Sequence, residues 1–263
     1  MLGLLLLPLA LAFDNGVART PPLGWNSWNF LSDRVSSAAL RTTADFLVSS
    51  GLAAAGYTYI ISDDGWMGGR DNVTHRMFAD PVKFPGGWEP LVAYIHSKGL
   101  RAGIYSAASS VVCSSRVGSL YYELIDARTF ADWQLDYIKY DLCGEYAFGN
   151  SRFTAFMDAV NQTGRAMIVS TEPYSQHPTP EHKDFAHLWR TTNDIDARYE
   201  SILDRIDTND KWADFAAPGS WNDVRAHSPG STQGSSAPCS LSPPAPPPFP
   251  AARHAGGGQW RPH

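Results

Sequence analysis

Short apolar runs alternate with helix-like amphipathic stretches from about residue 20 onward. This alternation is typical of βα units, which build parallel sheets. The predicted strands are Leu23–Trp28, Tyr57–Ser62, Leu100–Ser106, Leu135–Tyr140, Ala166–Ser170, His187–Arg190 and a weaker Gly219–Asn222. The predicted helices are Ser37–Ser49, Trp88–Ser97, Tyr121–Trp133, Arg152–Val160 and Ile195–Asp207. Because strands buried on both faces read as continuous apolar runs, we expect an α/β fold with a parallel sheet.

Acidic residues follow four of these predicted strands. Asp63 and Asp64 come after the second strand, Asp141 after the fourth, Glu172 after the fifth and Asp194 soon after the sixth. In a (β/α)8 barrel the carboxyl ends of all strands face one active site, whereas a doubly wound sheet binds ligands only at its switch point. The sequence therefore predicts a TIM-type (β/α)8 barrel, incomplete with about seven strands, and one acidic site.

Carboxylates that meet in this way favour glycoside hydrolysis, which usually needs two of them. Lys139 lies two residues before Asp141 and should share its strand face, so we expect its charge to keep Asp141 ionised as the nucleophile. Asp194, four residues after Arg190, is the candidate acid/base. Two alternatives stay open: a lone Asp at a strand end can serve a helix cap or turn, and Lys139 with Asp141 can form a simple ion pair.

Composition narrows the possible partners. The 263 residues carry a net charge of −5, which predicts no basic face and no nucleic-acid partner. Trp and Tyr number 9 and 11, and such aromatic side chains can stack on sugar rings as well as fill a core. The three cysteines and eight histidines show no metal-ligand spacing, so we expect no metal and no cofactor.

The two ends of the sequence differ from the rest. Residues 2–12 are apolar and end in Ala10-Leu11-Ala12, which predicts a signal peptide over residues 1–12 and a secreted or vacuolar/lysosomal protein; a buried strand is the alternative. No later stretch is long and apolar enough to span a membrane. Residues 224–263 contain 9 Pro, 5 Gly and 6 Ser, so we expect a disordered tail after a catalytic domain over 13–223.

Five motifs resemble those of one known family. They are FDNGVARTPPLGWNSWNF at 13–30, YIISDDGW at 59–66, KYDLC at 139–143, WRTTND at 189–194 and PGSWND at 218–223. Together they resemble the α-galactosidases of glycoside hydrolase family 27, the melibiases. In that family the last motif continues Pro-Asp-Met-Leu, whereas Val224 follows here. We therefore expect an absent eighth strand with two unpaired sheet edges, and we interpret 224–263 as a frameshift, a retained intron or a mispredicted exon.

The resemblance implies roles for particular residues. It assigns Asp141 as nucleophile and Asp194 as acid/base, in agreement with the choice made from the residues. It also implies that the following residues bind the sugar: Trp28, Asp63, Asp64, Tyr105, Lys139, Glu172 and Arg190. Glu172 matches a position near the sugar C2 substituent, where it favours galactose over N-acetylgalactosamine. The family further implies a disulfide between Cys113 and Cys143, with two free thiols as the alternative.

The predicted function is retaining hydrolysis of terminal α-galactosides, with a galactoside oligosaccharide or glycoconjugate as substrate. A non-catalytic galactose-binding remnant and an inactive truncated gene product are the alternatives. An α-N-acetylgalactosaminidase is a further alternative, which Glu172 argues against.

Overall fold

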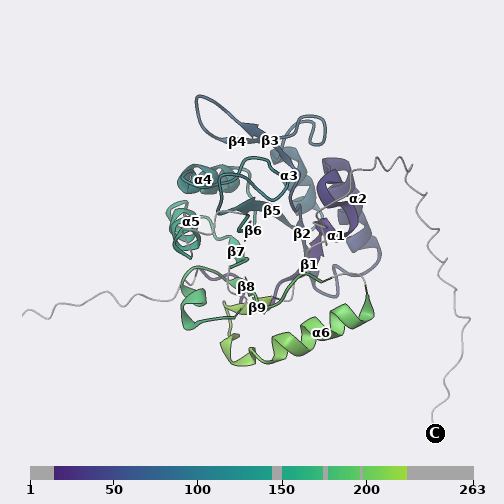
Figure 1. Cartoon of the computed structure of the whole chain (residues 1–263). Coiled ribbons are helices and arrows are strands. Elements are labelled where there is room, and N and C mark those ends of the chain that lie inside the picture. Colours follow the sequence, from purple (N-terminus) through teal and green to yellow (C-terminus); the bar gives the residue numbers. More distant parts are fainter. Residues whose placement is uncertain (1–14, 144–149, 174–176, 196–197, 224–263) are drawn as a thin grey trace, which may run out of the picture. The chain divides into compact units, whose positions relative to one another are not determined.

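Seven parallel strands form the main sheet of the computed structural model, and they curve in an arc when viewed along the strands (Figure 1). In sheet order they are β1 (Leu23–Asn26), β2 (Tyr57–Ile61), β5 (Arg101–Ala107), β6 (Tyr137–Asp141), β7 (Ile168–Thr171), β8 (Leu188–Arg190) and β9 (Trp221–Asp223). All seven predicted strands are present. The curled sheet confirms the predicted incomplete (β/α)8 barrel.

The structure describes residues 15–143, 150–173, 177–195 and 198–223. The predicted signal peptide over 1–12 and the Pro-rich segment 224–263 lie outside the described residues. Among the helices that the structure describes, none is long and apolar enough to cross a membrane.

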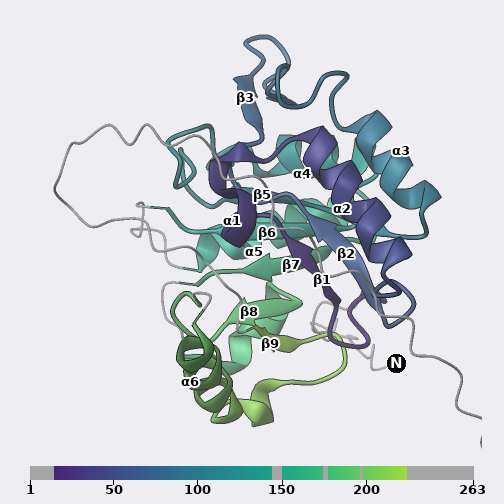
Figure 2. The ribbon, with the colours of Figure 1, turned by 90° about the vertical axis from the view of Figure 1, so that its right-hand side faces the viewer.

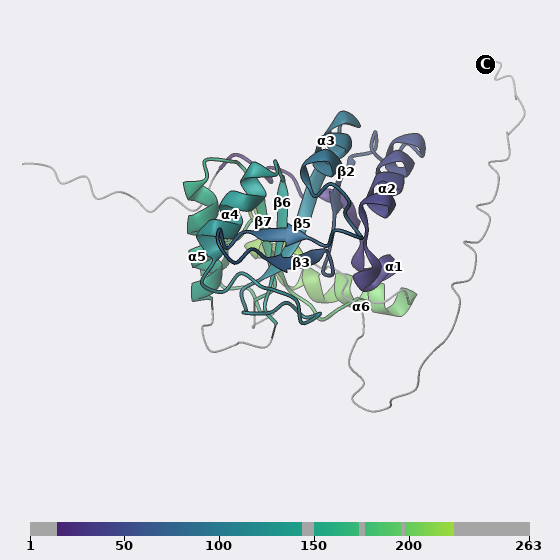
Figure 3. The same ribbon diagram turned by 90° about the horizontal axis from the view of Figure 1, so that it is seen from above.

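Helices cover the outer side of the sheet. They include α2 (Ser37–Ser49), α3 (Glu89–Ser97), α4 (Glu123–Asp132), α5 (Ser151–Gln162) and α6 (Tyr199–Asp210). The one-turn helix α1 (Trp28–Leu31) follows the end of β1, and the 3-10 turns are η1 (Ser32–Arg34), η3 (Pro180–Asp184) and η4 (Ala213–Phe215). Helices α2 and α3 lie side by side, as do α4 and α5 (Figure 3). Ser36 caps α2, because its hydroxyl accepts a hydrogen bond from the backbone N–H of Ala39 at 3.3 Å.

Alternation along β6 explains why a buried strand contains a lysine and an aspartate. The ring of Tyr140 stacks on Phe156 of α5 with 3.9 Å between ring centroids, so this residue faces the helices. Lys139, the residue before it, reaches side chains from the ends of two other strands on the opposite face. Successive side chains of a strand point to opposite faces, so Asp141 shares the inner face with Lys139.

A hairpin follows β2 that the hydrophobic pattern did not predict. Its strands are β3 (Met67–Arg70) and β4 (Met77–Ala79), which pair antiparallel and project away from the main sheet (Figure 2). Gly68 and Gly69 occupy half of β3, and glycine has low β propensity. Backbone pairing between β3 and β4 holds the hairpin together. The apolar runs that predict the main sheet do not reveal such pairing.

Helix α6 begins later than predicted, at Tyr199 rather than Ile195. Arg205 reaches back from the helix and donates from Nε to the backbone carbonyl of Asp194 at 3.2 Å. The carbonyl of Asp194 thus accepts from a side chain, where the first turn of a helix would supply a backbone N–H.

The edges of the sheet at β1 and β9 have no second strand partner among the described residues, as predicted. A cavity of about 210 Å³ lies against these edges and is lined by Asn26 of β1, Asp223 of β9 and the ring of Tyr59, among others. The two edges are linked through the N-terminal segment, because Trp221 Nε1 donates to the backbone carbonyl of Ala18 at 2.6 Å.

Candidate active site

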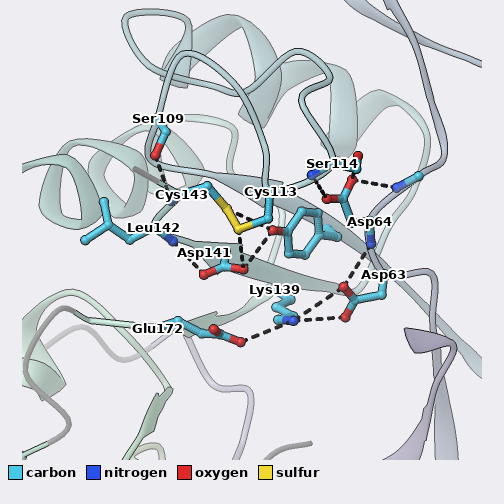
Figure 4. Close-up of a disulfide and its surroundings, with 12 residues drawn as sticks. Asp63, Asp64, Ser109, Cys113, Ser114, Lys139, Asp141, Leu142, Cys143 and Glu172 are labelled. Atoms are coloured by element: carbon cyan, nitrogen blue, oxygen red, sulfur yellow. Dashed lines mark hydrogen bonds and ion pairs between the residues drawn. A yellow bond between two sulfur atoms is a disulfide. The ribbon is translucent and has the colours of Figure 1, made fainter. Parts of the chain in front are cut away.

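Asp141 ends β6 and is buried, with 4% of its surface exposed. Its Oδ1 accepts a hydrogen bond from the backbone N–H of Leu142 at 2.7 Å, and its Oδ2 accepts one from the hydroxyl of Tyr105 at 2.7 Å. Tyr105 lies on β5, the neighbouring strand. Both donors stabilise the ionised carboxylate and fix its orientation (Figure 4).

The pKa of Asp141 is nevertheless raised, to about 8. Burial is the main cause, and the negative charge of Glu172 is the second. The charge of Lys139 lowers this pKa but does not offset the other two effects. Lys139 thus acts in the expected direction, but its charge does not keep the pKa of Asp141 at its ordinary value.

Lys139 connects the ends of three strands. Its side chain is fully buried, and its Nζ lies 3.0 Å from Asp63 Oδ2 after β2 and 3.1 Å from Glu172 Oε1 after β7. The ammonium also lies 4.9 Å from the ring centroid of Tyr105. A buried ammonium needs such partners, because an uncompensated charge would be very costly.

Glu172, Arg190 and Asp194 continue this series of charges across β7 and β8. Arg190 donates from one terminal nitrogen to Glu172 Oε2 at 2.7 Å and from the other to Asp194 Oδ1. Asp194 is partly open to solvent, with 35% of its side chain exposed. The candidate acid/base is thus more accessible than Asp141, and the ion pair with Arg190 orients it.

The two carboxylates after β2 are held by side chains whose roles the sequence did not predict. Asn26 Nδ2 donates to Asp63 Oδ2 at 2.7 Å, and the hydroxyl of Ser27 accepts from the backbone N–H of Asp63 at 2.9 Å. Ser114 binds both oxygens of Asp64. Asn26 and Ser27 are polar residues near the end of the predicted strand Leu23–Trp28, and that signal could have identified them.

Trp28 joins the site through its backbone, whose N–H donates to Asn26 Oδ1 at 2.9 Å. This side-chain bond forms an Asx-type turn, which ends β1 at Asn26 and lets Trp28 begin α1. The prediction that the first strand runs to Trp28 is wrong for this reason.

A disulfide joins Cys113 to Cys143, as the resemblance implied. Cys143 lies two residues after Asp141, and Cys113 belongs to the loop that follows β5 (Figure 4). The bond therefore fixes the chain beyond Asp141 to a neighbouring loop.

The predicted residues thus meet at the carboxyl ends of β2, β5, β6, β7 and β8. Ion pairs run from Asp63 through Lys139, Glu172 and Arg190 to Asp194, with Asp141 beside Tyr105. Carboxylates gathered at the strand ends of a (β/α)8-type barrel fit the two-carboxylate chemistry of the glycoside hydrolase class.

Comparison with known proteins defines the family within that class. The family model described as Alpha galactosidase A matches residues 20–230, and the chain belongs to this family, glycoside hydrolase family 27. Alpha-galactosidase 2 of Arabidopsis thaliana is 41% identical over 213 residues, which cover 80% of this chain and 54% of that protein.

Two solved structures show the same fold. The crystal structure of alpha-galactosidase I from Mortierella vinacea matches with a TM-score of 0.72 at 33% identity, covering 81% of this chain and 60% of that one. The structure of the α-galactosidase from Saccharomyces cerevisiae with raffinose matches with a TM-score of 0.71 at 31% identity, covering 80% and 53%. The chain spans about half the length of the curated relatives that it matches.

Proposed function

We propose that this chain is a retaining α-galactosidase, which removes terminal α-linked galactose from galactosides. The observation that carries the proposal is the connected set of charges at the strand ends. Lys139 pairs with Asp63 and Glu172, and Arg190 pairs with Glu172 and Asp194, in a chain that belongs to the α-galactosidase family. The charges of Lys139 and Glu172 both act on Asp141.

The proposed reaction has two steps. In the reactive form Asp141 is ionised and Asp194 carries a proton. Asp141 attacks the anomeric carbon of galactose while Asp194 transfers its proton to the leaving glycosidic oxygen, and a covalent galactosyl ester forms. Asp194, now ionised, takes a proton from water, whose oxygen attacks the same carbon and releases Asp141. The partial exposure of Asp194 supports this role, because both the leaving group and the water must reach it.

Substrate recognition follows from the remaining charges. Asp63 and Asp64 accept hydrogen bonds from the outer galactose hydroxyls, while Lys139 and Arg190 donate. Glu172 occupies the position near C2 and favours the plain 2-hydroxyl over an acetamido group. Raffinose is a first substrate to test, because the Saccharomyces cerevisiae relative was solved with it.

Hydrolysis of p-nitrophenyl α-galactoside by the full chain tests the proposal, with Asp141→Asn as the variant that lacks the nucleophile. We expect turnover that the variant loses, and proton NMR should show that the first product is the α-anomer. The N-acetyl analogue should be a poor substrate. Galactose binding without turnover would overturn the proposal in favour of a sugar-binding protein.

The proposal includes a secretory route to the outside of the cell, to the vacuole or to the lysosome. The disulfide between Cys113 and Cys143 supports it, because structural disulfides persist in oxidising compartments. N-terminal sequencing of the protein from the source organism tests it. A mature chain that begins near Phe13 is expected, and retention of residues 1–12 would contradict the route.

A further inference from the structure

The loop between β5 and α4 folds back on itself close to the proposed sugar site. Val112 donates from its backbone N–H to the carbonyl of Arg116 at 2.8 Å, and Ser115 donates to the carbonyl of Val112 at 2.8 Å. Ser115 adopts a positive φ of 62°, which closes this turn. The turn presents the residue between Cys113 and Ser115 towards the end of β2 (Figure 4).

That residue, Ser114, binds both oxygens of one carboxylate. Its backbone N–H donates to Asp64 Oδ2 at 2.8 Å, and its hydroxyl donates to Asp64 Oδ1 at 2.7 Å. Asp64 Oδ1 also accepts from the backbone N–H of Gly65 at 2.6 Å. A carboxylate offers about four lone-pair positions, so these three bonds leave one further position, on Oδ2.

The bonds from Ser114 also oppose the effect of burial. Asp64 is fully buried, and burial raises its pKa. The hydrogen bonds from the hydroxyl and the backbone N–H of Ser114 lower that pKa. Ser114 therefore favours the ionised form of Asp64, which is the better acceptor for a sugar hydroxyl.

Contacts with the segment after β6 and with the hairpin hold the loop in place. Cys113, next to Ser114, forms the disulfide with Cys143, and the hydroxyl of Ser109 accepts from the backbone N–H of Cys143 at 2.9 Å. From the hairpin, Arg70 donates to the carbonyl of Gly118 at 2.9 Å. A side chain at Gly118 would not fit, because its Cβ would lie 2.1 Å from the carbonyl oxygen of Ser109.

We propose that Ser114 is a positioning residue of the sugar site, which acts through Asp64 and fixes the one acceptor that Asp64 presents to a galactose hydroxyl. This inference rests on the proposed function. It predicts that loss of the hydroxyl weakens sugar binding and leaves the chemical step at Asp141 largely intact.

Steady-state kinetics on the full chain test the role. Ser114→Ala should raise the KM for p-nitrophenyl α-galactoside about tenfold with kcat changed less than twofold, because a bond to a charged group is lost. Ser114→Thr keeps the hydroxyl and should restore most of the KM. Ser115→Ala, the matched change one residue along the turn, should leave both constants as in the parent, and the melting temperatures should agree.

A double-mutant cycle with Asp64→Asn shows whether Ser114 acts through Asp64. The two changes should be strongly non-additive, so that Ser114→Ala has little further effect in the Asp64→Asn background. Additive effects, or a fall in kcat with unchanged KM, would overturn the proposal.

The test also separates this inference from the proposed function. If the parent binds galactose without turnover, the proposed function fails, and calorimetric Kd values for galactose take the place of KM in the same variants. A tenfold rise in Kd for Ser114→Ala then supports the positioning role. A parent that neither turns over nor binds galactose overturns both.

Discussion

The hydroxyl of Tyr105 donates to Oδ2 of Asp141 at 2.7 Å, across the pair of neighbouring strands β5 and β6. Tyr105 is fully buried, and its own pKa lies well above the usual range because of burial and then because of the charge of Asp141. The phenol therefore stays protonated throughout the pH range in which Asp141 titrates. It is a permanent donor that stabilises the ionised form of Asp141, the proposed nucleophile.

Replacing Tyr105 with Phe should raise the pKa of Asp141 further, because the bond from Tyr105 lowers it. In the proposed mechanism activity requires ionised Asp141, so the acid limb of the pH profile of kcat/KM should move up by about half a unit to one unit. We also expect kcat/KM to fall about tenfold near the optimum. An acid limb at the parental pH would show that another group controls it.

Glu172→Gln should have the opposite effect on the same limb. The charge of Glu172 raises the pKa of Asp141, and glutamine removes the charge while keeping the side-chain shape. The acid limb should therefore move to lower pH, by about one unit, even though the absolute rate should fall with the loss of the proposed sugar contact. Glu200→Gln, the same change at an exposed position of α6, is the control and should leave the profile unchanged.

Asp141→Asn should stabilise the fold at neutral pH. The pKa of Asp141 rises from 3.8 to about 8 on folding, so the folded chain binds more protons than the unfolded chain between these values. The contribution of Asp141 to the free energy of unfolding is therefore fully present below pH 3.8. It is lost as the pH rises towards 8, by up to about 1.4 kcal/mol per pH unit. The side-chain amide that Asp141→Asn introduces does not titrate, so the variant avoids this loss of stability.

Thermal melts of the parent and of Asp141→Asn measure this effect. The difference in melting temperature should be small near pH 4 and should grow in favour of the variant up to pH 8. Asp158→Asn, on the exposed side of α5, should show no such growth. A variant that melts below the parent at every pH would contradict the raised pKa.

The sequence predicted the strands well because parallel strands covered on both faces are continuous apolar runs. The same logic placed Asp63, Asp141 and Glu172 at one edge of the sheet, where the structure has them. Parallel strands share a direction, so residues that follow them must meet, whatever the distance between them along the chain.

The partners across the barrel could not be predicted in this way. Spacing along β6 associated Lys139 with Asp141, whereas the buried ammonium reaches Asp63 and Glu172 from other strands. Ser114 was missed for a similar reason, since a serine in a loop carries no periodic signal and its role depends on how that loop folds back. Sequence patterns report which face a residue occupies, but contacts between loops depend on tertiary packing.

The disulfide between Cys113 and Cys143 should contribute to stability and to sugar binding together. It closes a loop with a sequence separation of 30, for which chain entropy predicts about 3–4 kcal/mol. Cys113 also adjoins Ser114, so reduction should free the turn that holds Asp64. We therefore expect treatment with dithiothreitol to lower the melting temperature by several degrees and to raise KM, as Ser114→Ala does.

The Cys239→Ser chain, which keeps both bridging cysteines, should respond to the reductant as the parent does. In Ser114→Ala the reductant should cause no further rise of KM. A melting temperature that falls with unchanged KM would show that the bridge stabilises the fold without positioning the loop.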